Sequence, residues 1–219
     1  PHTLLVPKLD QDHMRKAHGI ERENIVAYWE YTAREQRSWQ HLLKGLIEGD
    51  QEIGVEPSLR REISDELHEY SLRTMPLVES LRLIKSPAEI EMIRRAALYA
   101  DVGVERLLAA SYYGATVAEG FAETKHVTTK VIREVDDWDP VTTNVLMATW
   151  AAPHSAMPHS IPALEHRLEA GPHVALVLTR VNGYAAESER TYFTAPPTKD
   201  ARVAFAAMME SRRIAFSMI

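Results

Sequence analysis

The chain has 219 residues, of which 25 are basic and 31 acidic, so its formal net charge at pH 7 is −6. Without a basic excess we expect neither a nucleic-acid partner nor binding to an anionic membrane, and the absence of cysteine excludes disulfides, thiolate metal sites and a cysteine nucleophile. No run approaches the roughly 18 apolar residues of a membrane span, and the first residues lack the pattern of a signal peptide. We therefore expect a soluble, cytoplasmic protein.

Residues 1–75 alternate short apolar runs with helical patterns. Strands are expected at 3–6, 25–29 and 52–55, and helices at about 11–18, around 39–47 and from 58 to about 70. This alternation predicts an α/β layer with a mostly parallel sheet. The sequence opens on a strand-like run and closes within a helical pattern, so we expect both ends to be cuts in a longer protein.

Two helices are expected after a junction at residues 79–85. The segment Ser86-Pro-Ala-Glu89 supplies an N-cap hydroxyl, a proline at the first helical position and a glutamate that reaches back to the cap. Apolar residues at steps of three and four then predict one amphipathic helix that ends before Gly114. The segment Thr116-Val-Ala-Glu119 repeats the capping pattern, and a second helix is expected to run to about Val135.

A β-hairpin is the clearest feature of the remaining chain. A strand at 143–150 leads into a loop with two histidines, and an apolar run at 174–178 follows. Asn182-Gly183 then predicts a tight turn into a second strand that reaches Thr191. The loop and the hairpin together form the expected polar site.

Several separated motifs resemble the pita-bread hydrolases, which include prolidase, aminopeptidase P, methionine aminopeptidase and creatinase. In the family's order, these motifs are Ile84-Lys-Ser-Pro-Ala-Glu-Ile-Glu-Met-Ile-Arg94, Gly114-Ala-Thr-Val-Ala-Glu119, Pro153-His-Ser-Ala-Met-Pro-His159, Leu168-Glu-Ala-Gly171, and Gly183-Tyr184 ahead of Arg190-Thr191. The resemblance implies an α/β (α+β) fold: part of a creatinase-like N-terminal α/β domain at 1–78, then the first half of a pita-bread catalytic domain at 79–219. It also implies an incomplete active site, because the family's second half carries a histidine and two glutamate metal ligands.

The resemblance assigns roles to the histidines of the loop. His159 matches the family's loop histidine, which assists proton transfer, and a neutral imidazole suits acid/base work near neutral pH. His154, where relatives often carry asparagine, is a candidate for substrate binding. His166 and His173, around the turn at Gly171, are expected to face solvent.

The metal ligands are where the sequence departs from the family. Dinuclear members place one aspartate in the strand before the Gly-Tyr pair and a second eleven positions later, so that hard oxygen ligands hold two ions. Here the second position is Glu187 and the first is Leu176. Leucine offers no lone pair, so we expect no two-metal centre of the usual composition and name no metal ligand in this chain. Glu187 with distal ligands could still hold a single ion weakly, and a divalent Mn, Zn, Co or Fe ion remains an option for the full-length protein.

Creatinase is the metal-free branch of the family, and Glu189-Arg190-Thr191 resembles its pattern. In that branch, carboxylates and arginines orient a small charged substrate, for which a guanidinium fork is well suited. Glu187 and Glu189 are expected to share one strand face, since side chains alternate along a strand, and Tyr184 is a further candidate for substrate binding. The alternative is that both glutamates are solvated and Arg190 pairs with a neighbour.

We expect the full-length protein to be a hydrolase that cleaves a C–N bond (amide, amidine or Xaa-Pro peptide) in a small molecule or dipeptide, and this chain to be inactive alone. Two alternatives stay open. One is a metal-dependent Xaa-Pro dipeptidase or aminopeptidase with an altered ligand set. The other is a non-catalytic pita-bread protein that serves for binding or dimerisation. The resemblance also implies a homodimer.

Overall fold

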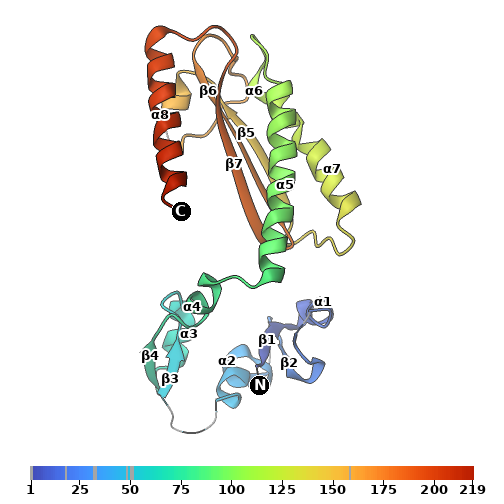
Figure 1. The fold of residues 1–219 in the computed structure, drawn as a ribbon. Helices are drawn as coiled ribbons and strands as arrows, with labels where there is room; N and C mark the ends of the chain where they lie inside the picture. The colour runs from blue at the N-terminus through green and yellow to red at the C-terminus, as the bar shows by residue number, and fades with distance from the viewer. Residues whose placement is uncertain (1, 18, 32–33, 48, 50–51, 158) are drawn as a thin grey trace. The chain divides into compact units, whose positions relative to one another are not determined.

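A computed structural model describes residues 2–17, 19–31, 34–47, 49, 52–157 and 159–219. The chain divides into two compact units, Pro1–Ile84 and Lys85–Ile219, and each unit is described by itself (Figure 1). Two residues of the segments discussed above, His18 at the end of the first expected helix and Pro158 in the histidine loop, lie outside the described residues. The domain ranges 1–78 and 79–219 stay a prediction. No helix within the described ranges is long and apolar enough to cross a bilayer.

The first unit contains short strands in parallel pairs. β1 (Leu4–Pro7) pairs with β2 (Ile25–Tyr28), and β3 (Glu52–Val55) pairs with β4 (Ser71–Thr74). The helices are α1 (Gln11–Met14), α2 (Trp39–Gly45), α3 (Arg61–Glu66) and α4 (Leu77–Leu83), with single 3-10 turns η1 (Lys8–Asp10), η2 (Arg22–Asn24) and η3 (Glu35–Arg37). The expected parallel pairing is confirmed. The expectation of one sheet is wrong for the described strands, which form two separate sheets.

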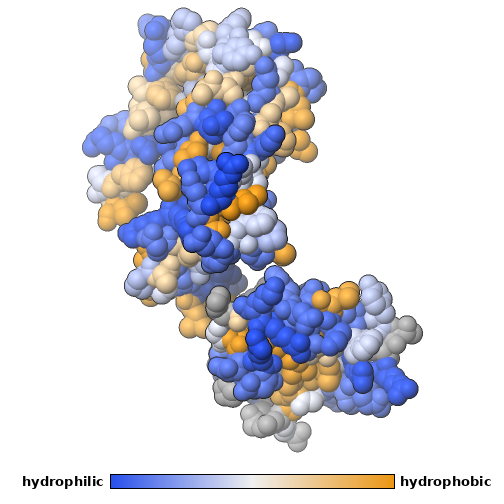
Figure 2. Space-filling model, turned by 90° about the vertical axis from the view of Figure 1, so that its right-hand side faces the viewer, coloured by the Kyte–Doolittle hydropathy of each residue, from blue (hydrophilic) through white to orange (hydrophobic). Residues whose placement is uncertain are grey.

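The second unit is an antiparallel sheet; the helices between residues 87 and 134 pack against one face, and the C-terminal helix lies beside the edge of the sheet (Figure 1). Its strands are β5 (Asn144–Trp150), β6 (Pro172–Val181) and β7 (Tyr184–Phe193), which lie in that order in the sheet. The helices are α5 (Pro87–Ala109), α6 (Val117–Ala122), α7 (Thr124–Glu134) and α8 (Lys199–Ser217), with a 3-10 turn η4 (His154–Ala156) in the histidine loop. Viewed from the side on which α5 and α7 lie, the surface is largely hydrophilic with scattered apolar side chains (Figure 2).

Both predicted capping boxes are present. Ser86 Oγ accepts the backbone N–H of Glu89, whose carboxylate accepts the backbone N–H of Ser86 at 2.7 Å, and Thr116 and Glu119 repeat the arrangement. The second predicted helix is instead two helices, α6 and α7. The break lies at Glu123, where the backbone N–H bonds to the carbonyl only three residues back and tightens the turn.

The helix-facing side of β6 forms the core of the second unit. Its fully buried side chains are His173, Ala175, Val177, Thr179 and Val181. Thr179 Oγ1 donates to the carbonyl of Ala96 on α5 at 2.7 Å. Gly103 of α5 leaves no room for a side chain, because a Cβ there would lie 2.5 Å from a methyl carbon of Val177. We call the side of the sheet that packs against α5 the covered face, and the opposite side the open face.

The hairpin forms as predicted. Asn182 and Gly183 have φ values of 47° and 89°, and two residues with positive φ are what a type I′ turn requires. The Asn182 side chain also fixes the turn, because its oxygen accepts the backbone N–H of Asp139 and the hydroxyl of Thr143, each at 3.1 Å. Pairing then continues without interruption from Val181–Tyr184 to Pro172–Phe193.

Candidate functional site

Two carboxylates lie on the open face of the edge strand β7. Glu187 is paired with Leu178 and Glu189 with Leu176, so the unbroken register places both glutamates on the side away from α5. Both residues are exposed, and within the described part of the chain neither carboxylate has an ion-pair or hydrogen-bond partner. They are therefore accessible to a charged ligand.

Arg190 and one of these carboxylates, Glu189, line a cavity of about 400 Å³. The cavity lies between the ends of β6 and β7 and helix α8, and its lining residues include Glu189, Thr191, Phe205 and Arg212. Arg190 is paired with Ala175, so its side chain starts on the covered side of the sheet. At the edge of the sheet its Nη1 donates to the backbone carbonyl oxygen of Glu189 at 2.6 Å. The guanidinium remains exposed and, among the described residues, forms no ion pair.

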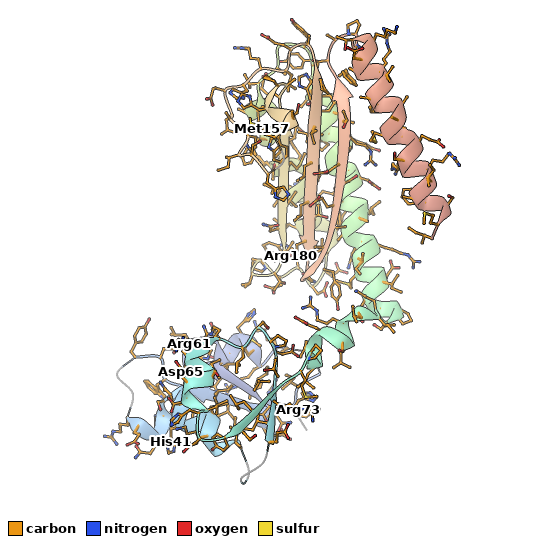
Figure 3. The ribbon with its side chains drawn as sticks, turned by 90° about the vertical axis from the view of Figure 1, so that its left-hand side faces the viewer. His41, Arg61, Asp65, Arg73, Met157 and Arg180 are labelled. Carbon is orange, nitrogen blue, oxygen red and sulfur yellow. The ribbon has the colours of Figure 1, made fainter. Side chains whose placement is uncertain are left out.

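The histidine loop lies at the other end of the hairpin from its turn. Figure 3 shows Met157 of the loop at the opposite end of the sheet from Arg180, which is near the turn. His159 is exposed and has a left-handed φ of 58°. His154 is half-buried, and its ring contacts that of His166, with 4.3 Å between the ring centroids.

The structure does not bring all predicted site residues together. Tyr184 is paired with Val181 and so faces the covered side, where its hydroxyl lies 3.5 Å from the carboxylate of Glu89 on α5. It is also the first residue of β7, at the turn end. In the described part of the chain, no contact links His154 or His159 to the carboxylates of β7. The candidate site residues thus fall into two separate groups, the histidines of the loop and the charged residues of the edge strand β7.

The fold is similar to that of several solved structures, although no family model and no curated protein matches the sequence. The prolidase from Pyrococcus horikoshii OT3 has a TM-score of 0.72 and 20% identity, over 97% of this chain and 57% of its own. The Xaa-Pro dipeptidase from Bacillus anthracis has a TM-score of 0.66 and 22% identity, over 95% and 56%. Zinc-substituted Escherichia coli aminopeptidase P, in complex with product, has a TM-score of 0.58 and 17% identity, over 80% and 43%.

The fold is that of the prolidases and aminopeptidase P. The expected resemblance in fold is confirmed, and the chain spans little more than half the length of the prolidases it matches.

The residues of this prolidase-like hairpin do not fit a two-metal centre. A pair of divalent ions needs several hard oxygen ligands at neighbouring positions. Leu176, which faces Glu189 and lies diagonally from Glu187, offers only an aliphatic side chain. Within the described residues, no group of three or more histidine or acidic side chains is placed to hold an ion. We therefore assign no step to a metal.

His173 contradicts the sequence-based expectation that it faces solvent. It is fully buried on the covered face, and its ring nitrogens contact the backbone of Ala152 and Glu169 and the hydroxyl of Thr194. Burial lowers its pKa from the ordinary value, although the Glu169 carbonyl opposes this shift. His173 shares the two-residue alternation of the buried residues Ala175 and Val177, and this pattern indicates burial. It is hidden in the sequence, because the run after His173 is apolar on both faces of the strand.

Proposed function

We propose that this chain is part of a hydrolase that cleaves a C–N bond in a small charged molecule or an Xaa-Pro dipeptide. The fold shared with prolidases and aminopeptidase P supports this class of reaction. The observation that carries the proposal is the edge of the hairpin, where exposed Glu189 and Arg190 line a cavity of about 400 Å³ and Glu187 lies two residues before Glu189 on the same face.

Each group has a distinct role in this reaction. Hydrolysis forms a bond from water oxygen to the carbon while the C–N bond breaks, so the water loses a proton and the leaving nitrogen gains one. His159 is the acid/base group that takes up the first proton and supplies the second. Glu187 and Glu189 accept hydrogen bonds from cationic or amide nitrogens of the substrate. Arg190 binds a substrate carboxylate through two parallel N–H donors.

The role of His159 is tested by His159→Ala in the full-length protein. We expect kcat to fall by roughly two to four orders of magnitude, which is the usual contribution of general acid–base catalysis. His126→Ala is the matched control, because His126 is an exposed histidine on α7. A rate unchanged by His159→Ala would refute the assignment.

The role of Arg190 is tested by Arg190→Lys, which keeps the charge but removes the two-pronged donor. We expect KM for a carboxylate-bearing substrate to rise roughly 10- to 100-fold, because hydrogen bonds to charged groups contribute about 1.5–3 kcal/mol. Arg180→Lys is the control, since Arg180 lies near the turn, at the other end of the hairpin from Met157 (Figure 3). Equal effects of the two substitutions would exclude a specific role for Arg190.

The metal-dependent alternative is supported by the zinc-substituted aminopeptidase P among the similar structures. Elemental analysis and turnover after chelation, both on the full-length protein, separate the two mechanisms. Retained turnover without bound metal supports the creatinase-like route, whereas loss that Mn²⁺ or Zn²⁺ reverses supports the peptidase route.

The shared fold does not require catalysis, and a non-catalytic binding or dimerisation module remains the third candidate. Absence of turnover on amidines and Xaa-Pro dipeptides by the full-length protein would favour it. For the 219-residue chain alone we expect no hydrolysis, because it spans 56–57% of the prolidases it resembles. Homodimer formation and a cytoplasmic location stay predictions.

A further inference from the structure

A buried polar cluster joins the start of the histidine loop to the start of β6. Nδ1 of His173 lies 3.0 Å from the backbone nitrogen of Ala152, which immediately precedes the loop. Nε2 of the same ring lies 2.9 Å from the carbonyl oxygen of Glu169 and 3.1 Å from Oγ1 of Thr194. One imidazole therefore connects three segments that are far apart in the sequence.

The geometry determines which nitrogen of His173 carries the proton. The Ala152 backbone N–H is only a donor, so Nδ1 must be the unprotonated acceptor. Nε2–H then faces the Glu169 carbonyl, and Thr194 Oγ1 can also accept from it while donating its own proton to the same carbonyl at 2.6 Å. All three partners are satisfied only by the neutral Nε2–H tautomer.

Two further contacts hold the loop at the same place. Ser155 Oγ donates to the carbonyl of Pro172 at 2.6 Å, one residue before His173. A Cβ added at Gly171 would lie 2.7 Å from that of Ala152, so the two backbones approach closely. One side chain of β6, His173, and one side chain of the loop, Ser155, thus attach the loop to the first residues of β6.

We propose that His173 is a positioning residue that fixes the entry of the histidine loop, and with it the placement of His159, by accepting the Ala152 N–H. The proposal rests on the proposed function for its consequence in catalysis, but the tether itself is a property of this chain. Its chemistry requires a neutral ring, because a second proton on Nδ1 would face the Ala152 N–H and displace the loop. The titratable group that faces the ring is Tyr192 of β7, with 5.4 Å between ring centroids. Within the described residues, no carboxylate or ammonium group contacts the imidazole.

The first test is nitrogen NMR of the 219-residue chain labelled with ¹⁵N-histidine. We expect His173 to show an unprotonated Nδ1, a protonated Nε2 and a scalar coupling across the bond from the Ala152 N–H. The opposite tautomer, or a doubly protonated ring at neutral pH, would overturn the proposal.

The second test uses three substitutions that separate the two ring nitrogens. In His173→Asn the side-chain oxygen can replace Nδ1 as acceptor, in His173→Gln the amide can replace only the Nε2 donor, and His173→Leu replaces neither. We expect hydrogen exchange of the Ala152 amide to accelerate about tenfold in the Gln and Leu variants and to stay near wild type in the Asn variant. Equal protection in all three would exclude the tether.

In the full-length enzyme, the Gln variant should lower kcat by roughly 10- to 100-fold with little change in KM, since a small misplacement of a catalytic group has effects of that size. The Asn variant should restore most of the rate. Rescue by Gln but not by Asn would contradict the role given to Nδ1. If His159→Ala leaves the rate unchanged while the Ala152 amide behaves as expected, the proposed function fails and the tether stands.

Discussion

The two faces of the β5–β7 sheet are built from the same strands but differ in how deeply their side chains are buried. On β5, Met147 is fully buried whereas its neighbour Leu146 is 44% exposed. On the hairpin, the covered face carries Val177 and the open face carries Glu187 and Glu189. Packing against α5 fixes the covered face, so substitutions there should cost more stability than those on the open face.

The largest effect on stability should come from truncating Met147. Met147→Ala is expected to lower the free energy of unfolding by about 2–5 kcal/mol, because it removes a buried side chain and leaves a cavity. Leu146→Ala, one residue earlier on the open face, should cost less than about 1 kcal/mol. Urea unfolding of both variants measures the difference, and equal costs would show that the open face is packed as tightly as the covered one.

A smaller loss is expected from adding a methyl group where α5 meets the sheet. Gly103→Ala should destabilise by about 1–3 kcal/mol, because the new Cβ overlaps Val177 and α5 must shift. Gly45→Ala is a control on α2, where nothing lies within 4 Å and alanine should be neutral or stabilising by about 0.4–1 kcal/mol. Stabilisation by both substitutions would mean that α5 does not lie so close to β6.

The parts of this fold that local chemistry determines could be predicted from the sequence. The capping boxes at Ser86 and Thr116 and the turn at Asn182-Gly183 form because a few adjacent residues satisfy their own backbone groups. β4 was missed because Ser71-Leu-Arg-Thr74 has a single apolar residue, and only its pairing with β3 makes it a strand. Pairing partners in a sheet are a property of the whole fold.

The positions of the candidate site residues on the sheet could be predicted only in part. The sequence places Glu187 and Glu189 on one face, and the register agrees. By the same alternation Tyr184 falls on the face opposite the two glutamates, and its hydroxyl lies near Glu89 of α5. His173 was misassigned because the Gly171 turn suggested solvent, whereas its buried partners come from distant segments.

Acidification should weaken the covered face through His173, a single-group effect smaller than either core substitution. Burial lowers its folded pKa below the ordinary value of about 6.5 that it regains on unfolding, so the unfolded chain binds more protons between the two pKa values. Its contribution to stability is full above about pH 6.5 and declines as pH falls from there through the folded pKa. Comparing urea midpoints at about pH 8 and about pH 5 for wild type and His173→Asn isolates the effect. An identical pH dependence in both would show that His173 is not responsible.

The smallest effect should come from placing a charge at position 176 on the open face. Leu176→Asp puts a carboxylate directly opposite Glu189, and like charges opposite each other in a sheet cost roughly 0.2–1 kcal/mol. Leu176→Asn has nearly the same shape without the charge, so the difference between the two variants measures repulsion alone. Adding Glu189→Gln to each should remove most of that difference, and salt should reduce it, because both side chains are accessible to solvent. A difference unchanged by Glu189→Gln would contradict repulsion by Glu189 and would assign the effect to another group, such as Glu187, which lies diagonally from position 176.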